Sequence, residues 1–442
     1  MFIEFQIGNF RSFRDIQKFT MQAAPIRSND SGLNEGNVFV SSDIRLLKSK
    51  AIYGSNASGK SNLIHGLSHF CELVSNSVAQ EGIPKRIWEN SFKLITDWEK
   101  EPIFFQYIFL SDRLIHRYGF QIFEDKIIYE WLFEGEGKNE IEYFMRSPND
   151  LRINNEYFTG AEESKIQASR VDNELFRDDS LFLTGAALSA NRIASKIRNE
   201  IKSILFVNGF EDPYAIQFGL NKLLNGTEEE KKALKGLVSA ADTGIDDLEF
   251  VNEIDYDSKN QILQSSESPS NKIWLKKTSS LFSTHKRYNE NGVFVDKISV
   301  PFANWESNGT KKIFSIGASV LDSLKNNKTL IIDEFDALLH PNLTLKILDL
   351  YNSENTNPHN VQIIFVTHDS GLLRRADLRR DQICLVDKDK YGISTIKTLI
   401  EFKGIRKDAS YEKEYLNGNY EGVPSLEKMD RVVTQNNRDN GL

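Results

Sequence analysis

Three short stretches of this 442-residue chain are almost continuously apolar, at 51–53, 329–333 and 361–367. Such runs are typical of strands that are buried on both faces of a parallel sheet covered by helices. They end at or next to Tyr53, Asp333 and His368. Because open parallel sheets bind ligands at the carboxyl ends of their strands, we predict that these strand ends contribute to a ligand-binding site.

Helical periodicity is clearest in two places. Apolar residues at helical spacing over 63–70 predict a helix that runs to about residue 80, and those over 313–324 predict a second one. Residues 160–240 are rich in Ala, Lys and Glu and are also predicted to be helical. The charged run at 228–234 is predicted to be a solvated helix face.

Strand patterns occupy much of the remaining chain. Alternation over 2–7 predicts an edge strand that enters a polar and aromatic turn at 9–13. Further strands, rich in aromatic and β-branched residues and partly joined as hairpins, are predicted at 103–110, 118–123, 126–134, 248–251 and 272–276.

The residues after the first apolar run, Gly54-Ser-Asn-Ala-Ser-Gly-Lys-Ser61, fit the phosphate-binding pattern G-x-x-x-x-G-K-[ST]. Gly54 and Gly59 allow a turn and a close backbone approach that a Cβ would block. We expect Lys60 to reach the β- and γ-phosphates of ATP and Ser61 to ligate Mg²⁺. The other predicted nucleotide ligands near this loop are Asn56, Ser58 and Asn62. A plain glycine-rich turn is the alternative, but the strand before it and the helix after it favour nucleotide binding.

The other two strand ends carry side chains that suit ATP hydrolysis. Asp333 is predicted to hold Mg²⁺ together with Ser61. Glu334 is predicted to polarise the attacking water as a general base, although a carboxylate at a strand end can also be structural. His368 is predicted to hydrogen-bond the γ-phosphate. These residues predict an enzyme that converts ATP and water to ADP and phosphate.

A second anion site is predicted at Ser307-Asn-Gly309, just before the apolar helix. A Ser-x-Gly sequence at a helix start supplies a hydroxyl, unpaired N–H groups and the positive end of the helix dipole. Alone, such a sequence is only an N-cap with a flexible turn.

Taken in order, these motifs and the long insert between them resemble the ATPase heads of the ABC class, in particular the SMC, RecF and overcoming-lysogenization branch. In those heads the Ser-x-Gly signature of one subunit completes the γ-phosphate site of the other. The resemblance therefore implies that Ser307 and Gly309 act in trans, in a homodimer or higher homo-oligomer. The sequence Asn-Phe-Arg-Ser-Phe at 9–13 resembles the opening motif of this branch, whose basic residue approaches the nucleotide, which gives that role to Arg11.

Several stretches are also similar to the RloA and AbiL type of bacterial phage-defence ATPase, with the ATPase subunit of the PARIS system among the possible relatives. They lie at 2–13, 51–62, 306–310, 333–341 and 415–420. This resemblance implies an ATPase that controls a separately encoded effector, often a Toprim-type nuclease, in antiviral defence by abortive infection. One departure is His340-Pro341, which stands where transporters and SMC heads carry an Asp.

The resemblance implies an α/β fold, with a mostly parallel sheet flanked by helices, an antiparallel β subdomain and a mixed β and helical insert. The expected divisions are 1–80 with the P-loop, 81–160 as a β-rich segment, 161–245 as a helical insert, 246–400 with the signature, Asp333, Glu334 and His368, and 401–442 as a C-terminal tail.

Composition restricts the location and the partners. The net charge of −8 does not steer the whole protein towards nucleic acid, so DNA contact would need a local patch such as the arginines at 374–375 and 379–380. Such a patch would suit the alternative function, a RecF- or SMC-like DNA-binding ATPase in genome maintenance. No apolar run is long enough to span a membrane, and Cys71 and Cys384 have no metal-ligand spacing, so we expect a cytoplasmic protein with reduced thiols and no membrane contact.

Two further functions are disfavoured by the sequence. A nuclease within this chain would need a domain around Asp387-Lys-Asp389, but the residues that follow are too few to form one. A transporter subunit is disfavoured by the long insert and the RecF-like start. The aromatic residues over 411–423 cannot form a core of their own and must pack on the ATPase or bind a partner. Because the motif at 415–420 is expected to lie outside the nucleotide-contacting elements, we predict that it serves assembly or docks the effector.

Overall fold

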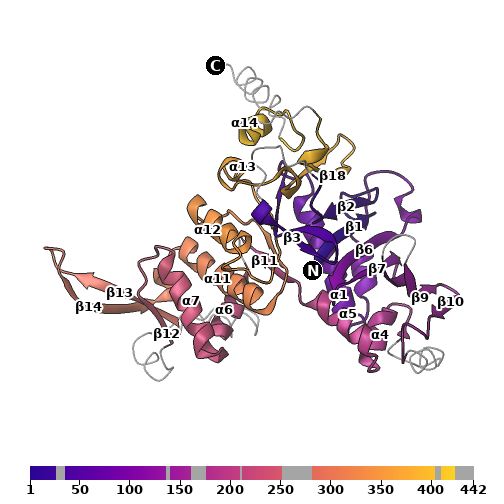
Figure 1. Ribbon diagram of the computed structural model, residues 1–442, viewed down its shortest axis with the longest axis horizontal. Coiled ribbons are helices and arrows are strands. Elements are labelled where there is room, and N and C mark those ends of the chain that lie inside the picture. The colour runs from indigo at the N-terminus through magenta and orange to yellow at the C-terminus, as the bar shows by residue number, and fades with distance from the viewer. Residues whose placement is uncertain are drawn as a thin grey trace, which may run out of the picture. The chain divides into compact units, whose positions relative to one another are not determined.

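The computed structural model describes residues 1–25, 35–135, 140–160, 176–209, 212–250, 281–403 and 410–423. The chain forms two compact units, the first made of Met1–Ser203 with His368–Leu442 and the second of Ile204–Thr367 (Figure 1). The strand predicted at 272–276 lies outside the described residues. Among the helices described, none combines the length and the apolar character needed to cross a membrane.

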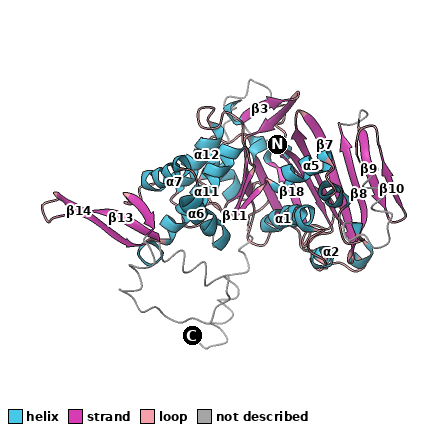
Figure 2. Cartoon of the chain, turned by 90° about the horizontal axis from the view of Figure 1, so that it is seen from below, coloured by secondary structure: helices cyan, strands magenta, loops and turns pink. Residues whose placement is uncertain are grey.

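The larger sheet of the first unit has seven strands, and every neighbouring pair in it is antiparallel. In spatial order the strands are β10 (Asp150–Ile153), β9 (Ile141–Ser147), β8 (Lys126–Glu134), β7 (Leu114–Phe123), β6 (Ile103–Ser111), β1 (Phe2–Gly8) and β2 (Gln17–Thr20). Figure 2 shows β7 to β10 side by side. The hairpins predicted between 103 and 134 are confirmed.

Strand β1 lies inside this sheet, so the prediction of an edge strand was wrong. It pairs with β2 on one side and with β6 on the other, and Phe5 is opposite both Phe19 and Tyr107. Alternation of apolar residues reports which face of a strand is buried. It does not report how many neighbours the strand has, because β6 comes from a distant part of the chain.

Helix α1 (Lys60–Asn76) packs on this sheet through the predicted apolar face and ends slightly before residue 80. The ring of Phe70 contacts that of Phe5, with 5.7 Å between centroids, and stacks on that of Phe120 at 5.2 Å. Gly66 permits the close approach, because a Cβ there would collide with the side chain of Ile7. The unit also contains α2 (Ile83–Trp88), α4 (Phe182–Leu188) and α5 (Arg192–Lys202).

A second group of strands in the first unit carries the P-loop. Strand β5 (Ser49–Tyr53) is buried at every position and is parallel to β17 (Ile383–Lys388), with Leu385 opposite Tyr53. Strand β18 (Ser394–Thr398) pairs with β17 in the antiparallel direction. The described part of this unit also contains the hairpin β3 (Val38–Ser41) and β4 (Ile44–Leu47), and the short helices α13 (Leu372–Arg375) and α14 (Tyr411–Leu416).

The second unit contains three parallel strands in the order β11 (Leu205–Asn208), β15 (Leu330–Asp333) and β16 (Ile363–Val366). Helices α6 (Pro213–Asn225), α7 (Glu228–Ala240), α11 (Asn308–Asn326) and α12 (Pro341–Asn352) belong to the same unit.

Strand β11 corrects the prediction that 161–245 is a helical insert. Only four residues long, this strand lies between two helical segments and leaves no periodic signal of its own. The parallel strands and helices of this unit, together with the antiparallel sheet of the first unit, confirm the predicted α/β class.

A second, antiparallel sheet in this unit has the order β12 (Asp247–Phe250), β13 (Leu281–Tyr288) and β14 (Phe294–Pro301). Strands β13 and β14 form a hairpin that extends away from the helices of the unit (Figure 1). Its base leads through the short helix α10 (Phe302–Trp305) directly into the signature segment.

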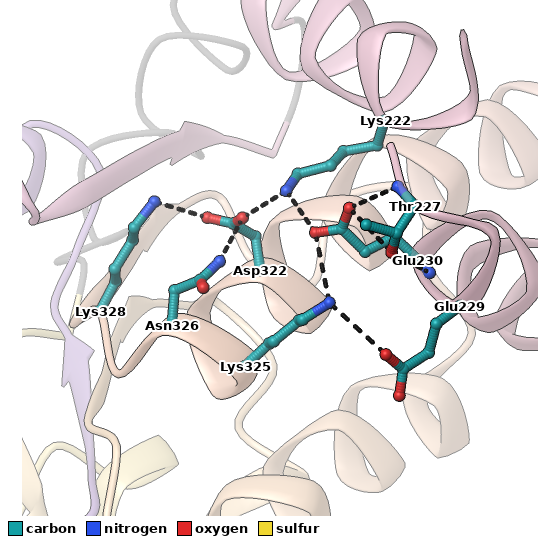
Figure 3. A network of polar contacts seen from close by, with 8 residues as sticks. All are labelled: Lys222, Thr227, Glu229, Glu230, Asp322, Lys325, Asn326 and Lys328. Carbon is teal, nitrogen blue, oxygen red and sulfur yellow. Dashed lines mark hydrogen bonds and ion pairs between the residues drawn. The ribbon is translucent and has the colours of Figure 1, made fainter. Parts of the chain in front are cut away.

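Charged side chains join α6, α7 and α11 (Figure 3). The Nζ atom of Lys222 lies 2.7 Å from Asp322 and 2.9 Å from Glu230, and the side chain of Asp322 is only 2% exposed. Lys328 also pairs with Asp322, at 2.9 Å. The charged run at 228–234 is therefore not simply a solvated face. Its first residues are exposed, but Glu230 holds α7 against the neighbouring helices.

Candidate functional site

The predicted P-loop connects β5 to α1. Gly59 has φ 118° and forms the N-cap of α1, so the helix begins at Lys60. A Cβ on Gly59 would lie 2.5 Å from Ser394 Oγ and 2.8 Å from Ser12 Oγ. Both the left-handed backbone and the tight packing therefore require glycine here. The loop passes between the turn after β1 and strand β18.

The polar side chains of this loop differ in the hydrogen-bond partners that they have. Lys60 Nζ donates to the carbonyl oxygens of Gly54 at 2.8 Å and Ser55 at 2.9 Å. The hydroxyl of Ser58 is buried and has no hydrogen-bond partner among the described residues. Asn56, at the tip of the loop, is exposed. A buried hydroxyl without a partner is costly, so the loop has a polar group that a bound anion would satisfy.

The structure places Arg11 beside the first turn of α1. Its guanidinium donates to Asn62 Oδ1 at 3.4 Å and to Asn90 Oδ1 at 3.1 Å. Asn62 in turn donates to Ser12 Oγ at 2.7 Å. Arg11 has φ 49° and is partly exposed, and Ser61 next to Asn62 is half-buried. Four of the predicted nucleotide-binding residues, Arg11, Lys60, Ser61 and Asn62, thus surround the start of one helix.

The predicted metal ligand and general base lie at the end of β15, in the second unit. Asp333 is the last residue of the strand, and its carbonyl accepts a hydrogen bond from Gly209 N at 2.7 Å. Its Oδ1 accepts from Glu334 N at 3.1 Å. Glu334 has φ 54°, an uncommon conformation for a residue with a Cβ. The turn is held further by Phe335 N, which donates to Val366 O at 2.9 Å.

Lys312 holds the same turn from α11, and sequence reasoning missed it. Its ammonium donates to the carbonyl oxygens of Glu334 at 2.9 Å, Phe335 at 3.0 Å and Ala337. Burial lowers the pKa of Lys312 to about 8. The available signal was a lysine inside the apolar stretch of a helix, one turn after Gly309. Such a lysine needs buried acceptors.

The signature segment begins α11. Ser307 is the N-cap and accepts a hydrogen bond from Thr310 N at 3.1 Å. Ser307 is exposed, and the nearby Trp305 is 68% exposed. A Cβ on Gly309 would lie 2.8 Å from Leu338 O, so glycine lets the first turn of α11 approach the segment after Glu334.

The remaining predicted site residues are placed as follows. His368 is exposed and comes two residues after the end of β16. His340 is the N-cap of α12 and accepts from Asn342 N at 3.2 Å, with Pro341 in the first turn, so this pair starts a helix. The P-loop, Arg11 and His368 belong to the first unit, and Asp333, Glu334 and the signature belong to the second.

The candidate DNA patch does not form a surface of unpaired arginines. The side chain of Arg379 is fully buried and pairs with Asp381 at 2.9 Å. Two others also pair with carboxylates, Arg374 with Glu412 and Arg375 with Asp369. The sequence shows four arginines close together, but it does not show the distant or buried carboxylates that pair with three of them.

The C-terminal motif lies next to the P-loop, and its position outside the nucleotide-contacting elements stays a prediction. Tyr415 and Tyr420 are 9% and 7% exposed, and Gly422 lies against Gly54. The described aromatic residues pack on their own unit, which was the alternative to partner docking. Whether the segment also docks an effector stays a prediction.

A strand, a glycine-rich loop ending in Gly-Lys-Ser and a helix that starts at the lysine define a P-loop domain of the ATPase type. The chain belongs to the family described as "AAA domain, putative AbiEii toxin, Type IV TA system", whose profile matches residues 51–374. Among solved structures it is similar to the SMC head domain from Thermotoga maritima, at 11% sequence identity and a TM-score of 0.38, covering 90% of this chain and 98% of that chain. No curated protein matches the chain.

Proposed function

We propose that this protein is an ABC-class ATPase that binds ATP at the P-loop, hydrolyses it and dimerises head to head. The observation that carries the proposal is the hydrogen bonding of two side chains in the P-loop. Ser58 has a buried hydroxyl without a partner among the described residues, and the ammonium of Lys60 donates hydrogen bonds to two carbonyl oxygens of the loop. Both groups would gain charge-assisted hydrogen bonds from a phosphate.

Each predicted residue has a defined task in this function. The N–H groups of the P-loop and Lys60 bind the β- and γ-phosphates. Glu334 accepts a proton from the attacking water, and His368 hydrogen-bonds the γ-phosphate. Ser61 and Asp333 have the hydroxyl and carboxylate oxygens that Mg²⁺ prefers and would hold it. Mg²⁺, when bound with ATP, neutralises the negative charge that the phosphates carry.

Dimerisation is proposed because the signature faces solvent. The exposed Ser307, with exposed Trp305 beside it, makes the Ser-x-Gly helix start accessible to a second copy. The positive end of α11 would then meet the γ-phosphate bound by the other subunit. The motif order resembles heads in which the signature acts in this way.

We further propose that nucleotide state controls a separately encoded effector in defence against phage. The resemblance to RloA- and AbiL-type ATPases supports this role, and the family description mentions a toxin of a type IV TA system. DNA clamping has less support, because three arginines of the candidate patch are paired with carboxylates. Co-purification with the product of the neighbouring gene, with and without ATP, tests effector control.

A titration with MgATP, followed by a phosphate-release assay, tests the ATPase proposal. Lys60→Ala should weaken binding about 10- to 100-fold, because a hydrogen bond to a charged group contributes about 1.5–3 kcal/mol. Lys93→Ala, which removes an exposed lysine of the same unit, should bind like the wild type. If the wild type and Lys60→Ala bound ATP equally well, the proposed site would be wrong.

A further inference from the structure

The C-terminal segment 410–423 places a glycine directly against the P-loop. Gly422 has φ +88°, a left-handed conformation that favours glycine. A Cβ on Gly422 would lie 3.1 Å from the Cα atom of Gly54 and 3.3 Å from Val386 O. The backbone of the C-terminal segment therefore contacts the first glycine of the nucleotide loop.

Tyr415 holds the contacting glycine in place. Its hydroxyl donates to Gly422 O at 3.1 Å, and Gly422 is the residue that lies against Gly54. Its ring lies edge-on to the ring of Tyr53, the last residue of β5, with 5.7 Å between centroids. Burial raises the pKa of Tyr415 further above neutral, where the phenol already carries the proton that it donates.

Further contacts hold the segment to the first unit. Gly422 N donates to Asp387 Oδ1 at 3.2 Å, and Lys397 pairs with Glu421 at 2.5 Å. The ring of Tyr420 packs edge-on against that of Phe402, with 5.7 Å between centroids. The partners Asp387 and Lys397 lie on β17 and β18, so the segment is fixed to the strands that flank the P-loop.

Gly54 is thus confined on more than one side. A Cβ on Gly54 would collide with Val386 O and would lie 2.5 Å from Ser58 Oγ, so the loop already packs tightly against β17. Gly54 also supplies a carbonyl that accepts from Lys60. A loop held in its binding conformation loses less conformational entropy when the ligand binds. Contacts that fix Gly54 should therefore increase the affinity for phosphate.

We propose that Tyr415 and Gly422 are positioning residues of the nucleotide site, and that the C-terminal segment holds the Gly54 turn in the conformation that binds ATP. This proposal rests on the ATP-binding function proposed above. The segment acts on affinity through the loop and does not itself touch the phosphates. A partner that displaced the segment would weaken ATP binding.

Two tyrosines of the segment provide a matched test in the full-length protein. Tyr415→Phe removes the hydroxyl that holds Gly422 in its position against Gly54. Tyr420→Phe removes a buried hydroxyl that has no hydrogen-bond partner among the described residues. One hydrogen bond contributes about 0.5–1.5 kcal/mol, so Tyr415→Phe should raise the Kd for MgATP about 2- to 10-fold. Tyr420→Phe should leave it unchanged.

Gly422→Ala provides a second, stronger change. The added methyl group would meet Gly54 and would force a left-handed residue with a Cβ, so the Kd for MgATP should rise at least as much as in Tyr415→Phe. In Tyr415→Phe and Gly422→Ala, the KM for ATP should rise while kcat stays near that of the wild type. Thermal unfolding without nucleotide shows whether the fold is kept.

The outcomes separate this proposal from the proposed function. If Tyr415→Phe and Gly422→Ala bind MgATP like the wild type, while Lys60→Ala binds it more weakly, the positioning proposal is wrong and the ATPase proposal stands. Equal weakening by Tyr415→Phe and Tyr420→Phe would also overturn positioning, because only general packing would then be involved. If the wild type itself does not bind ATP, the proposed function fails.

Discussion

The ammonium of Lys312 donates to the carbonyl oxygen of Glu334 at 2.9 Å, which ties the signature helix to the residue predicted as the general base. Glu334 has a positive φ, and such a conformation costs about 1–3 kcal/mol unless neighbouring groups hold it. The three carbonyls bound by Lys312 belong to this turn. A shift of α11 on nucleotide binding would therefore be transmitted to the backbone of Glu334.

Lys312→Met should reduce ATP turnover much more than ATP binding. The change keeps the apolar stem but leaves three carbonyls without their donor, so the turn that carries Glu334 should move. A displacement of about 1 Å at a reacting group can cost about 100-fold in rate. Steady-state phosphate release and MgATP titration measure the two effects separately. Lys311→Met, the same change at a half-buried neighbour, is the control, and equal losses in both variants would contradict the prediction.

Ser307→Arg should bind ATP normally but fail to hydrolyse it, since the arginine would block a signature that works on the second subunit's nucleotide. Ser307→Ala is the matched control, because both changes remove the N-cap of α11 at a cost of about 1 kcal/mol. Ser307→Ala should retain part of the turnover. Normal hydrolysis by Ser307→Arg would exclude a trans-acting signature and leave a simpler P-loop enzyme.

Glu334→Gln should bind ATP, hydrolyse it very slowly and accumulate as a dimer. The amide keeps the size of the side chain but is a poor base, so the ATP-bound state persists. Light scattering with MgATP measures the mass of the complex. Adding Lys60→Ala to this variant should return it to the monomer at an ATP concentration near the Kd of the wild type, since the weakened site would then be mostly empty. A monomer at full ATP occupancy would count against head-to-head dimerisation.

The charged cluster of the second unit should make stability fall in acid. The hydrogen bond from Lys222, together with the backbone N–H of Thr227, lowers the pKa of Glu230 to about 2. Its ordinary value is 4.5, so the folded state binds the proton less well than the unfolded state. The stabilisation is complete above about pH 4.5 and is lost as the pH falls towards about 2.

This dependence is measured as urea midpoints at several pH values. Glu230→Gln should lower the midpoint near neutral pH and lose less of it in acid than the wild type. Glu229→Gln, which changes the exposed neighbour, should follow the wild type. Parallel pH curves for the wild type and Glu230→Gln would show that Glu230 does not contribute.

The sequence by itself determined the local parts of this protein. The P-loop could be predicted because its pattern lies in eight consecutive residues and depends on no distant part of the chain. The helix after it and the hairpins of 103–134 could be predicted because side-chain periodicity reports which face is buried. Asp333 and Glu334 were found because an apolar strand leads directly into two carboxylates.

Only the tertiary structure decided which distant residues support these parts. Lys312 reaches the turn of Glu334, Tyr415 packs on Tyr53, and Gly422 lies against Gly54. None of these contacts follows from periodicity, because the partner of the lysine, the tyrosine or the glycine comes from another element. A local pattern specifies which face of an element is buried, and the packing of the whole chain specifies what that face meets.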